Sequence, residues 1–138
     1  MARLGVVSPP MKSATYRGRP EPFSIQVGLA FSGGTMFELI EPLSGDSIWW
    51  ETLDRNGREA SFQHVAIYVE DYDGAVQEML RRGWRAVQTA EGFGRSADGA
   101  LTYFEHDQGG AVMVEIVRGP RDRYPAERIH PAPREDGR

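Results

Sequence analysis

Three ionisable residues stand in apolar segments that are typical of strands, and their side-chain types suit one shared ligand. His64 lies in "FQHVAIYV", Glu38 in "TMFELIE" and Glu115 in "VMVEIV". Successive side chains of a strand point to opposite faces, so each polar residue belongs to the face opposite its strand's main apolar stripe. The neighbours that share these faces are Ala66 and Tyr68 beside His64, Met36 and Ile40 beside Glu38, and Met113 and Val117 beside Glu115. If the three faces form one concave surface, the ionisable side chains converge.

Two carboxylates beside an imidazole need a cation, a proton or an arginine, because a buried carboxylate without a partner is costly. Imidazole and carboxylate together suit a divalent ion such as Zn, Mn, Fe, Co or Ni. The chain has no cysteine, so thiolate ligands and disulfides are excluded. Two alternatives stay open: a structural histidine at a strand start, and glutamates on a solvated face. Glu41 has the opposite parity to Glu38 and is expected to be exposed.

The remaining pattern alternates strands with two helices. Asp71 or Asp73 can cap the second helix, and Gly83 can close it. The predicted elements are a short strand 4–7, a hairpin 23–31 and 35–41 turning at 32–34, a helix within 41–57, a strand 62–69, a helix to about 82, a strand 84–90, and a hairpin 100–120 turning at 108–110.

Composition and charge limit the class of protein. A length of 138 residues, with 40% hydrophobic and 26% charged residues, fits one globular domain. The net charge of −4 argues against nucleic-acid binding, which needs clustered basic residues. No apolar run approaches the roughly 20 residues that span a bilayer, and no signal peptide is visible, so we expect a cytoplasmic protein without a membrane partner. The segment 119–138 is rich in proline and charge and predicts a flexible tail.

Two segments repeat one pattern. "GGTMFELIEP" and "GGAVMVEIVRGP" each have a Gly-Gly turn, an apolar strand, a glutamate, two apolar residues and a nearby proline. The repeat indicates an internal duplication, with Glu38 and Glu115 at corresponding positions.

These segments, in this order, resemble the vicinal oxygen chelate superfamily, which includes glyoxalase I, methylmalonyl-CoA epimerase, extradiol dioxygenases and bleomycin-resistance proteins. "ELIEPLSGDSIWWETL" followed by "QHVAIYVEDYDGAV" is most similar to the epimerase branch. The resemblance implies an α+β fold of paired βαβββ modules, with a cupped mixed sheet and helices on its outer face. It covers about residues 4–118, and the domain 1–118 then divides into a partial first module (1–43), a linker helix (44–60) and a second module (61–118).

The resemblance also implies roles for individual residues. His64, Glu38 and Glu115 match metal-ligand positions, and Glu38 or Glu115 can also move a proton. Tyr68, Met36 and Met113 would line the substrate site, and Arg17 and Arg19 in "YRGRPEPF" can bind an anionic group of the substrate. For these two arginines, solubilising a loop is the alternative.

One departure from the family pattern concerns the first module, which lacks its opening strand, most of its helix and the fourth ligand. Either the chain as given starts late, or a partner subunit supplies the layer, or the site is reduced. His106 and His130 are two weaker candidates for the missing ligand. An incomplete module exposes a sheet edge and an apolar face, so we expect a homodimer.

The function implied is a metal-dependent isomerase, epimerase or lyase that transfers a proton next to a carbonyl. A metal-free protein of the same fold that binds or sequesters a small molecule is the first alternative. An extradiol-type dioxygenase ranks third, because it needs two histidines and one glutamate, and only one matching histidine is present.

Overall fold

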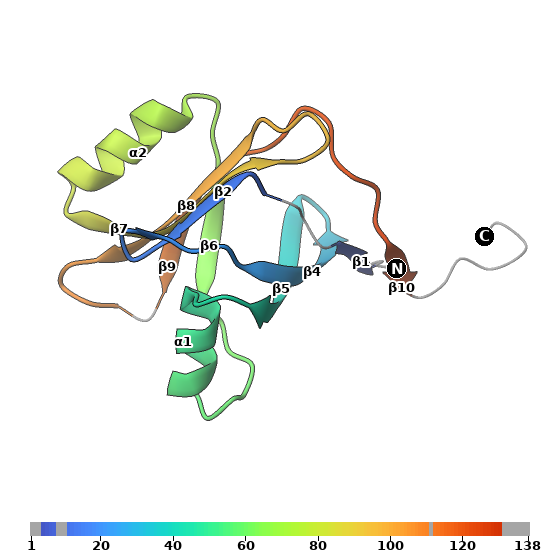
Figure 1. Ribbon diagram of the computed structural model, residues 1–138, viewed down its shortest axis with the longest axis horizontal. Coiled ribbons are helices and arrows are strands. Elements are labelled where there is room, and N and C mark those ends of the chain that lie inside the picture. Colours follow the sequence, from blue (N-terminus) through green and yellow to red (C-terminus); the bar gives the residue numbers. More distant parts are fainter. Residues whose placement is uncertain (1–3, 8–10, 111, 131–138) are drawn as a thin grey trace, which may run out of the picture.

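The computed structural model describes residues 4–7, 11–110 and 112–130, and strands dominate an α+β fold of two sheets (Figure 1). This is the fold class that the sequence predicts. The elements are β1 (Leu4–Val7), β2 (Ser13–Tyr16), β3 (Arg19–Pro20), β4 (Ser24–Ser32), β5 (Thr35–Ser44), α1 (Ile48–Arg55), β6 (His64–Tyr68), α2 (Tyr72–Arg81), β7 (Trp84–Phe93), β8 (Gly99–His106), β9 (Met113–Arg118) and β10 (Arg128–His130).

The larger sheet has the strand order β3-β2-β7-β8-β9-β6. Strand β6 runs parallel to β9, and the other pairs are antiparallel. Strands β6 to β9 with helix α2 form a βαβββ unit. Helix α2 packs on one face, called the outer face, where Ile116 and Phe104 are buried beneath Val76 and Met79. The opposite, inner face carries His64 and Glu115.

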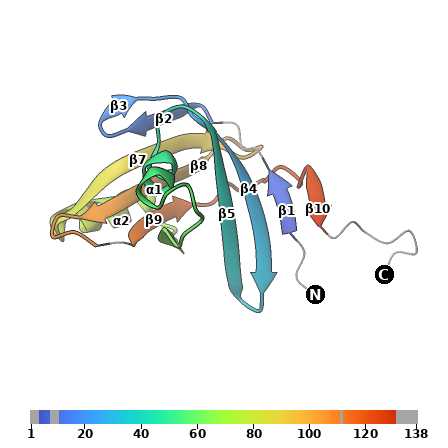
Figure 2. The ribbon, with the colours of Figure 1, turned by 90° about the horizontal axis from the view of Figure 1, so that it is seen from below.

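The smaller sheet has the order β10-β1-β4-β5, all antiparallel. The long β4–β5 hairpin projects beside the larger sheet (Figure 2). It turns through Gly33 and Gly34, with Gly33 at φ +58°, in the left-handed region that favours glycine. The hairpin predicted from the Gly-Gly pair is therefore confirmed.

The two helices begin at the polar residues that cap them, and they lie on opposite sides of the larger sheet. The Asp71 side chain accepts a hydrogen bond from the Gly74 amide at the start of α2, and Ser47 does the same for Trp50 at the start of α1. In α1 the buried Ile48 and Trp49 pack in the cluster that contains Tyr103, on the inner side of the sheet. Only α2 therefore lies on the outer face, whereas both helices are predicted there.

The segment after β9 crosses from one sheet to the other (Figure 1). The sequence predicts a flexible tail from residue 119. The described part instead contains β10, which pairs with β1. Residues 119–127, called the strap, are fixed to the loop 94–98: Asp122 accepts hydrogen bonds from the Arg95 and Ser96 amides at 2.8 and 3.4 Å, and Arg121 pairs with Asp98 at 2.6 Å. Composition alone misses this order because local sequence does not reveal long-range pairing.

Both sheets end in a strand with an open edge. β5 ends the smaller sheet and β6 ends the larger one, and neither pairs on its far side with another described residue. Phe37 and Leu39 on β5 are more than half exposed, and Val65 and Ile67 on β6 are about half exposed. No described helix has the length and apolar character needed to cross a membrane.

Candidate metal centre

Glu38, His64 and Glu115 come together on the inner face. One ligand atom of each lies within 4.8 Å of the others. The His64 Nε2 atom is 3.1 Å from Glu38 Oε2 and 3.4 Å from Glu115 Oε2. β6 and β9 place His64 and Glu115 side by side in one sheet, while Glu38 comes from β5 in the other sheet. The two strands of the repeated sequence pattern thus each contribute one carboxylate.

Gln63 fixes the orientation of the His64 ring. The Gln63 amide nitrogen donates hydrogen bonds to Thr52 Oγ1 at 2.8 Å and to the Ile48 carbonyl at 3.2 Å, both in α1. Its oxygen therefore faces His64 Nδ1, at 3.1 Å, and can only accept. The Nδ1 atom must carry the hydrogen, so in neutral His64 the Nε2 lone pair points at two carboxylates. The arrangement requires a proton or a cation between them.

Glu115 has an unusual electrostatic environment. Burial, with its side chain 6% exposed, raises its pKa to about 8, and the nearby Glu38 charge adds to the rise. A hydrogen bond from Tyr103 opposes the shift. Tyr103 is itself 1% exposed, and burial together with the two carboxylates raises its pKa well above its ordinary value. Without a compensating cation, Glu115 holds its proton at neutral pH.

Tyr103 packs between the centre and helix α1. Its ring lies 5.0 Å from the His64 ring and 5.6 Å from the Trp49 ring, both edge to face. Tyr103 and Glu115 are register partners on β8 and β9, so they share the inner face. This packing restricts the movement of the His64 ring and of the Glu115 carboxylate.

The donor set fits a divalent ion. Two carboxylate oxygens and one imidazole nitrogen are ligands that first-row metals accept. A second residue that holds the other imidazole nitrogen, as Gln63 does, is typical of metal-binding histidines. Three protein donors match the number in catalytic sites, where a further position takes water or substrate.

The predicted wall residues share the inner face with this cluster. Met113 is buried and lies in register with His64 on the neighbouring strand. Met36 is half-buried and lies in register with Phe31, which is 58% exposed. Tyr68 is 48% exposed. Each of these side chains shares the strand face of one member of the cluster: Met36 that of Glu38, Tyr68 that of His64, and Met113 that of Glu115.

Arg17 and Arg19 are engaged elsewhere. Arg17 binds both Glu51 oxygens, at 2.7 and 2.8 Å, and reaches Glu105 at 3.2 Å. Arg19 pairs with Asp46 at 2.7 Å. The structure does not bring either guanidinium into the cluster of Glu38, His64 and Glu115. Their role in binding a substrate anion stays a prediction.

The other two histidines lie outside the cluster. His106 stacks edge to face on Trp84 at 5.0 Å, and its Nδ1 accepts a hydrogen bond from the Gln108 amide. His130 lies in β10, in register with Leu4 at the far side of the smaller sheet. Among the described residues, the metal-ligand cluster contains one histidine.

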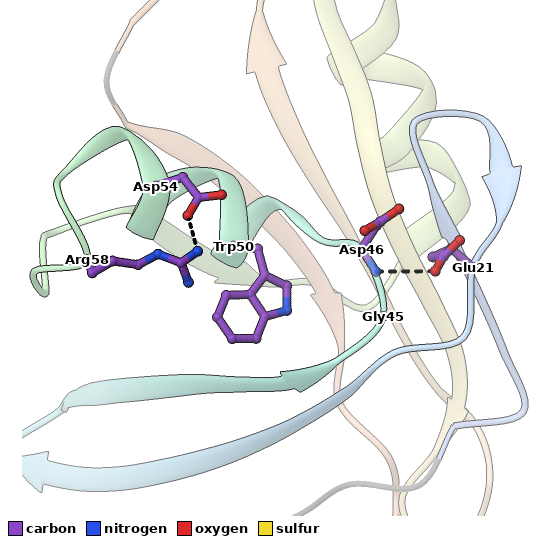
Figure 3. A pocket seen from close by; sticks show the side chains of 6 residues that line it. All are labelled: Glu21, Gly45, Asp46, Trp50, Asp54 and Arg58. Atoms are coloured by element: carbon purple, nitrogen blue, oxygen red, sulfur yellow. Dashed lines mark hydrogen bonds and ion pairs between the residues drawn. The ribbon is translucent and has the colours of Figure 1, made fainter.

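An open hollow of about 490 Å³ lies beside α1, away from these side chains (Figure 3). It is lined by Glu21, Gly45, Asp46, Trp50, Asp54 and Arg58. Its charged groups already have partners: Arg58 pairs with Asp54 and lies over the Trp50 ring, and Glu21 accepts the Asp46 amide. The hollow therefore offers no free charge for a ligand.

Sequence reasoning missed Gln63 and Tyr103. Gln63 lies within the predicted strand 62–69, where alternation places it on the face of Val65, opposite His64, but the observed strand begins only at His64. Tyr103 has the parity of Leu101 and Glu105 in "LTYFEH", so alternation places it on a face. Only the register of β8 against β9 puts that face beside Glu115.

Comparison with known families gives a match that covers most of the chain. Residues 2–104 match the sequence model of a family described as the Glyoxalase/Bleomycin resistance protein/Dioxygenase superfamily. The matched segment contains Glu38 and His64 and ends before Glu115. Among curated proteins, none gives a significant match to the chain.

Proposed function

The chain belongs to the Glyoxalase/Bleomycin resistance protein/Dioxygenase superfamily, and from this premise we propose that it is a metal-dependent isomerase, epimerase or lyase. The proposed reaction moves a proton next to a carbonyl of a small acid, thioester or similar metabolite. One observation carries the proposal: Gln63 holds His64 so that Nε2 points at the oxygens of Glu38 and Glu115.

The proposed ligands are His64, Glu38 and Glu115. A divalent ion bound by them would supply Lewis acidity toward an oxygen beside the reacting carbon. Ion identity is open among Zn, Mn, Fe, Co and Ni, since the donor set suits each of them.

We assign the proton transfer to one of the two carboxylates. Glu38 is 25% exposed and Glu115 only 6%, so Glu38 is the one that a substrate entering from solvent reaches more easily. We assign to Glu38 the removal and return of the proton. Glu115, which lies between His64 and Tyr103, acts as a ligand only. Met36, Met113 and Tyr68 would enclose the substrate.

Metal content is the first test. Protein purified without chelator should contain about one divalent ion per chain by elemental analysis. His64→Ala should lose it, and His106→Ala, which removes a histidine outside the cluster, should keep it. Sub-stoichiometric metal that is the same in all three proteins would reject the proposal.

Proton transfer is the second test. The metal-loaded protein should catalyse solvent deuterium exchange into 2-substituted acyl thioesters or α-hydroxy carbonyl compounds. Glu38→Gln should abolish the exchange, while Glu41→Gln, on the exposed face of the same strand, should not. No exchange across such a panel would count against an epimerase.

A metal-free binding protein is the second candidate. The exposed rings of Phe31 and Tyr68 on the inner face favour it, because they offer an apolar wall to a ligand. This alternative predicts ligand binding that is unchanged by a chelator. An extradiol-type dioxygenase ranks third, because the described cluster has a single histidine.

We further propose a cytoplasmic homodimer related to the epimerase branch. The open edge of β5 and the exposed Phe37 and Leu39 support the dimer, because such an edge favours pairing with another chain.

A further inference from the structure

The strap reaches the rim of the proposed metal centre through Arg123. The guanidinium carbon lies 5.7 Å from the Tyr68 ring centroid, and the Arg123 charge opposes the rise of the Tyr68 pKa. Gly119 lies against the same ring: a Cβ at this position would be 3.3 Å from a Tyr68 ring carbon and 3.0 Å from Arg123 Nη2. The strap thus folds onto Tyr68 at two points.

Tyr68 faces the same space as the metal centre. It follows His64 and Ala66 on the inner face of β6, and Ala66 is the register partner of Glu115. Residues two apart on a strand are about 7 Å apart, so the Tyr68 Cα atom lies roughly 7 Å further along the strand direction than the Glu115 Cα atom. Burial raises the pKa of Tyr68, and the charges of Glu115 and Glu38 add to the rise, as their proximity requires. About half of the Tyr68 side chain stays open to solvent.

The positive charge of Arg123 is available to a ligand. Most described arginines pair with a carboxylate. Within the described part of the chain, no carboxylate lies at ion-pair distance from Arg123, and its side chain contacts Tyr68 instead. A guanidinium on an aromatic face keeps its N–H donors free for an oxyanion.

We propose that Arg123 and Tyr68 form an anion subsite, and that the substrate carries a second carboxylate, separate from the oxygens that reach the metal. A single guanidinium balances one charge, which suits a carboxylate better than a phosphate dianion. The inference rests on the proposed function, and it narrows the substrate class to small acids with a second, distal carboxylate. It also assigns to Arg123 the anion binding that the sequence suggests for Arg17 and Arg19.

A matched pair of ligands tests the subsite. 2-Oxoglutarate and 2-oxopentanoate share a chelating 2-oxo acid group and chain length, but only the former has a distal carboxylate. Mn²⁺ binding is first measured by calorimetry, and the Mn²⁺-loaded protein is then titrated with each acid. We expect 2-oxoglutarate to bind about tenfold tighter, the effect of one charge-assisted hydrogen bond.

Two variants assign the effect to a residue. Arg123→Gln should reduce the affinity ratio to about one without changing the Kd for 2-oxopentanoate. Arg128→Gln removes the same charge from β10, in register with Val6 and so with the outer side of the smaller sheet, and should leave the ratio unchanged. Both side chains are exposed, so neither substitution should impair folding.

The outcomes separate the subsite from the metal centre. Equal affinities for the two acids in the Mn²⁺-loaded wild type, or a preference that survives in Arg123→Gln, would overturn the subsite alone. Failure of the wild type to bind any of Mn²⁺, Zn²⁺, Fe²⁺, Co²⁺ and Ni²⁺ would overturn the proposed function, and the subsite with it.

Discussion

Glu115→Gln should remove most of the pH dependence of stability of the metal-free protein near neutral pH. The Glu115 carboxyl has a pKa of 4.5 when unperturbed and of about 8 in the folded protein, where burial and Glu38 raise it. Below pH 4.5 this carboxyl is protonated in both the folded and the unfolded state, so its contribution to the unfolding free energy is at its maximum. Between pH 4.5 and 8 the unfolded chain ionises while the folded protein keeps its proton, so stability falls as pH rises.

The magnitude follows from this window. Each pH unit within it costs about 1.4 kcal/mol of unfolding free energy, so the full window costs roughly 5 kcal/mol. That loss is a large share of the total stability of a domain of this size, which is of order 5–15 kcal/mol. Because the amide side chain introduced by Glu115→Gln does not titrate, the variant should lose stability much less steeply over the same range.

Urea denaturation at several pH values from 5 to 8, with chelator present, measures this effect. Glu41→Gln is the matched control, because Glu41 is exposed on the opposite face of β5, and it should keep the wild-type slope. Added metal should reverse the loss, because the ion displaces the Glu115 proton, and its apparent affinity should rise by up to about tenfold per pH unit below pH 8. Equal slopes for wild type and Glu115→Gln would refute the assignment of a raised pKa to this carboxyl.

Three further predictions concern the surroundings of the centre. Gln63→Met should weaken metal binding by about 10- to 100-fold, because it removes the acceptor that orients His64. The control Gln26→Met, on the outer side of β4, should not weaken it, and calorimetric titration with Mn²⁺ measures both variants. Gly94→Ala should release the strap, because Gly94 has φ +83° and a Cβ there would lie 2.3 Å from Pro120. Trypsin should then cleave faster within 118–124, and unchanged cleavage would contradict the attachment of the strap to loop 94–98. Leu39→Lys should convert the proposed dimer to a monomer in light scattering at micromolar concentration, and a monomeric wild type would rule the dimer out.

Local sequence was sufficient where one strand or turn carries the information. Alternation assigned Glu38, His64 and Glu115 to faces opposite their strands' main apolar stripes. The Gly-Gly pair marked the β4–β5 turn, and Asp71 marked the start of α2. These features depend on the period of the backbone and on residues close in sequence, so they can be read without a tertiary structure. That the three side chains meet within 4.8 Å agrees with that assignment, although metal binding stays a prediction.

Tertiary structure decided which side chains surround the cluster. Arg17 and Arg19 were plausible anion binders in the sequence, but folding places carboxylates from α1, β8 and the loop before α1 against them. Arg123 lies in a segment whose composition predicts disorder, yet the pairing of β10 with β1 and the hydrogen bonds to loop 94–98 carry it to Tyr68. Such partners are separated by tens of residues in sequence, and their contacts depend on strand register and on how the two sheets meet. Local periodicity contains neither, which is why the sequence alone indicated the three candidate ligands, and only the folded chain decided which side chains hold them and which lie at the rim of the cluster.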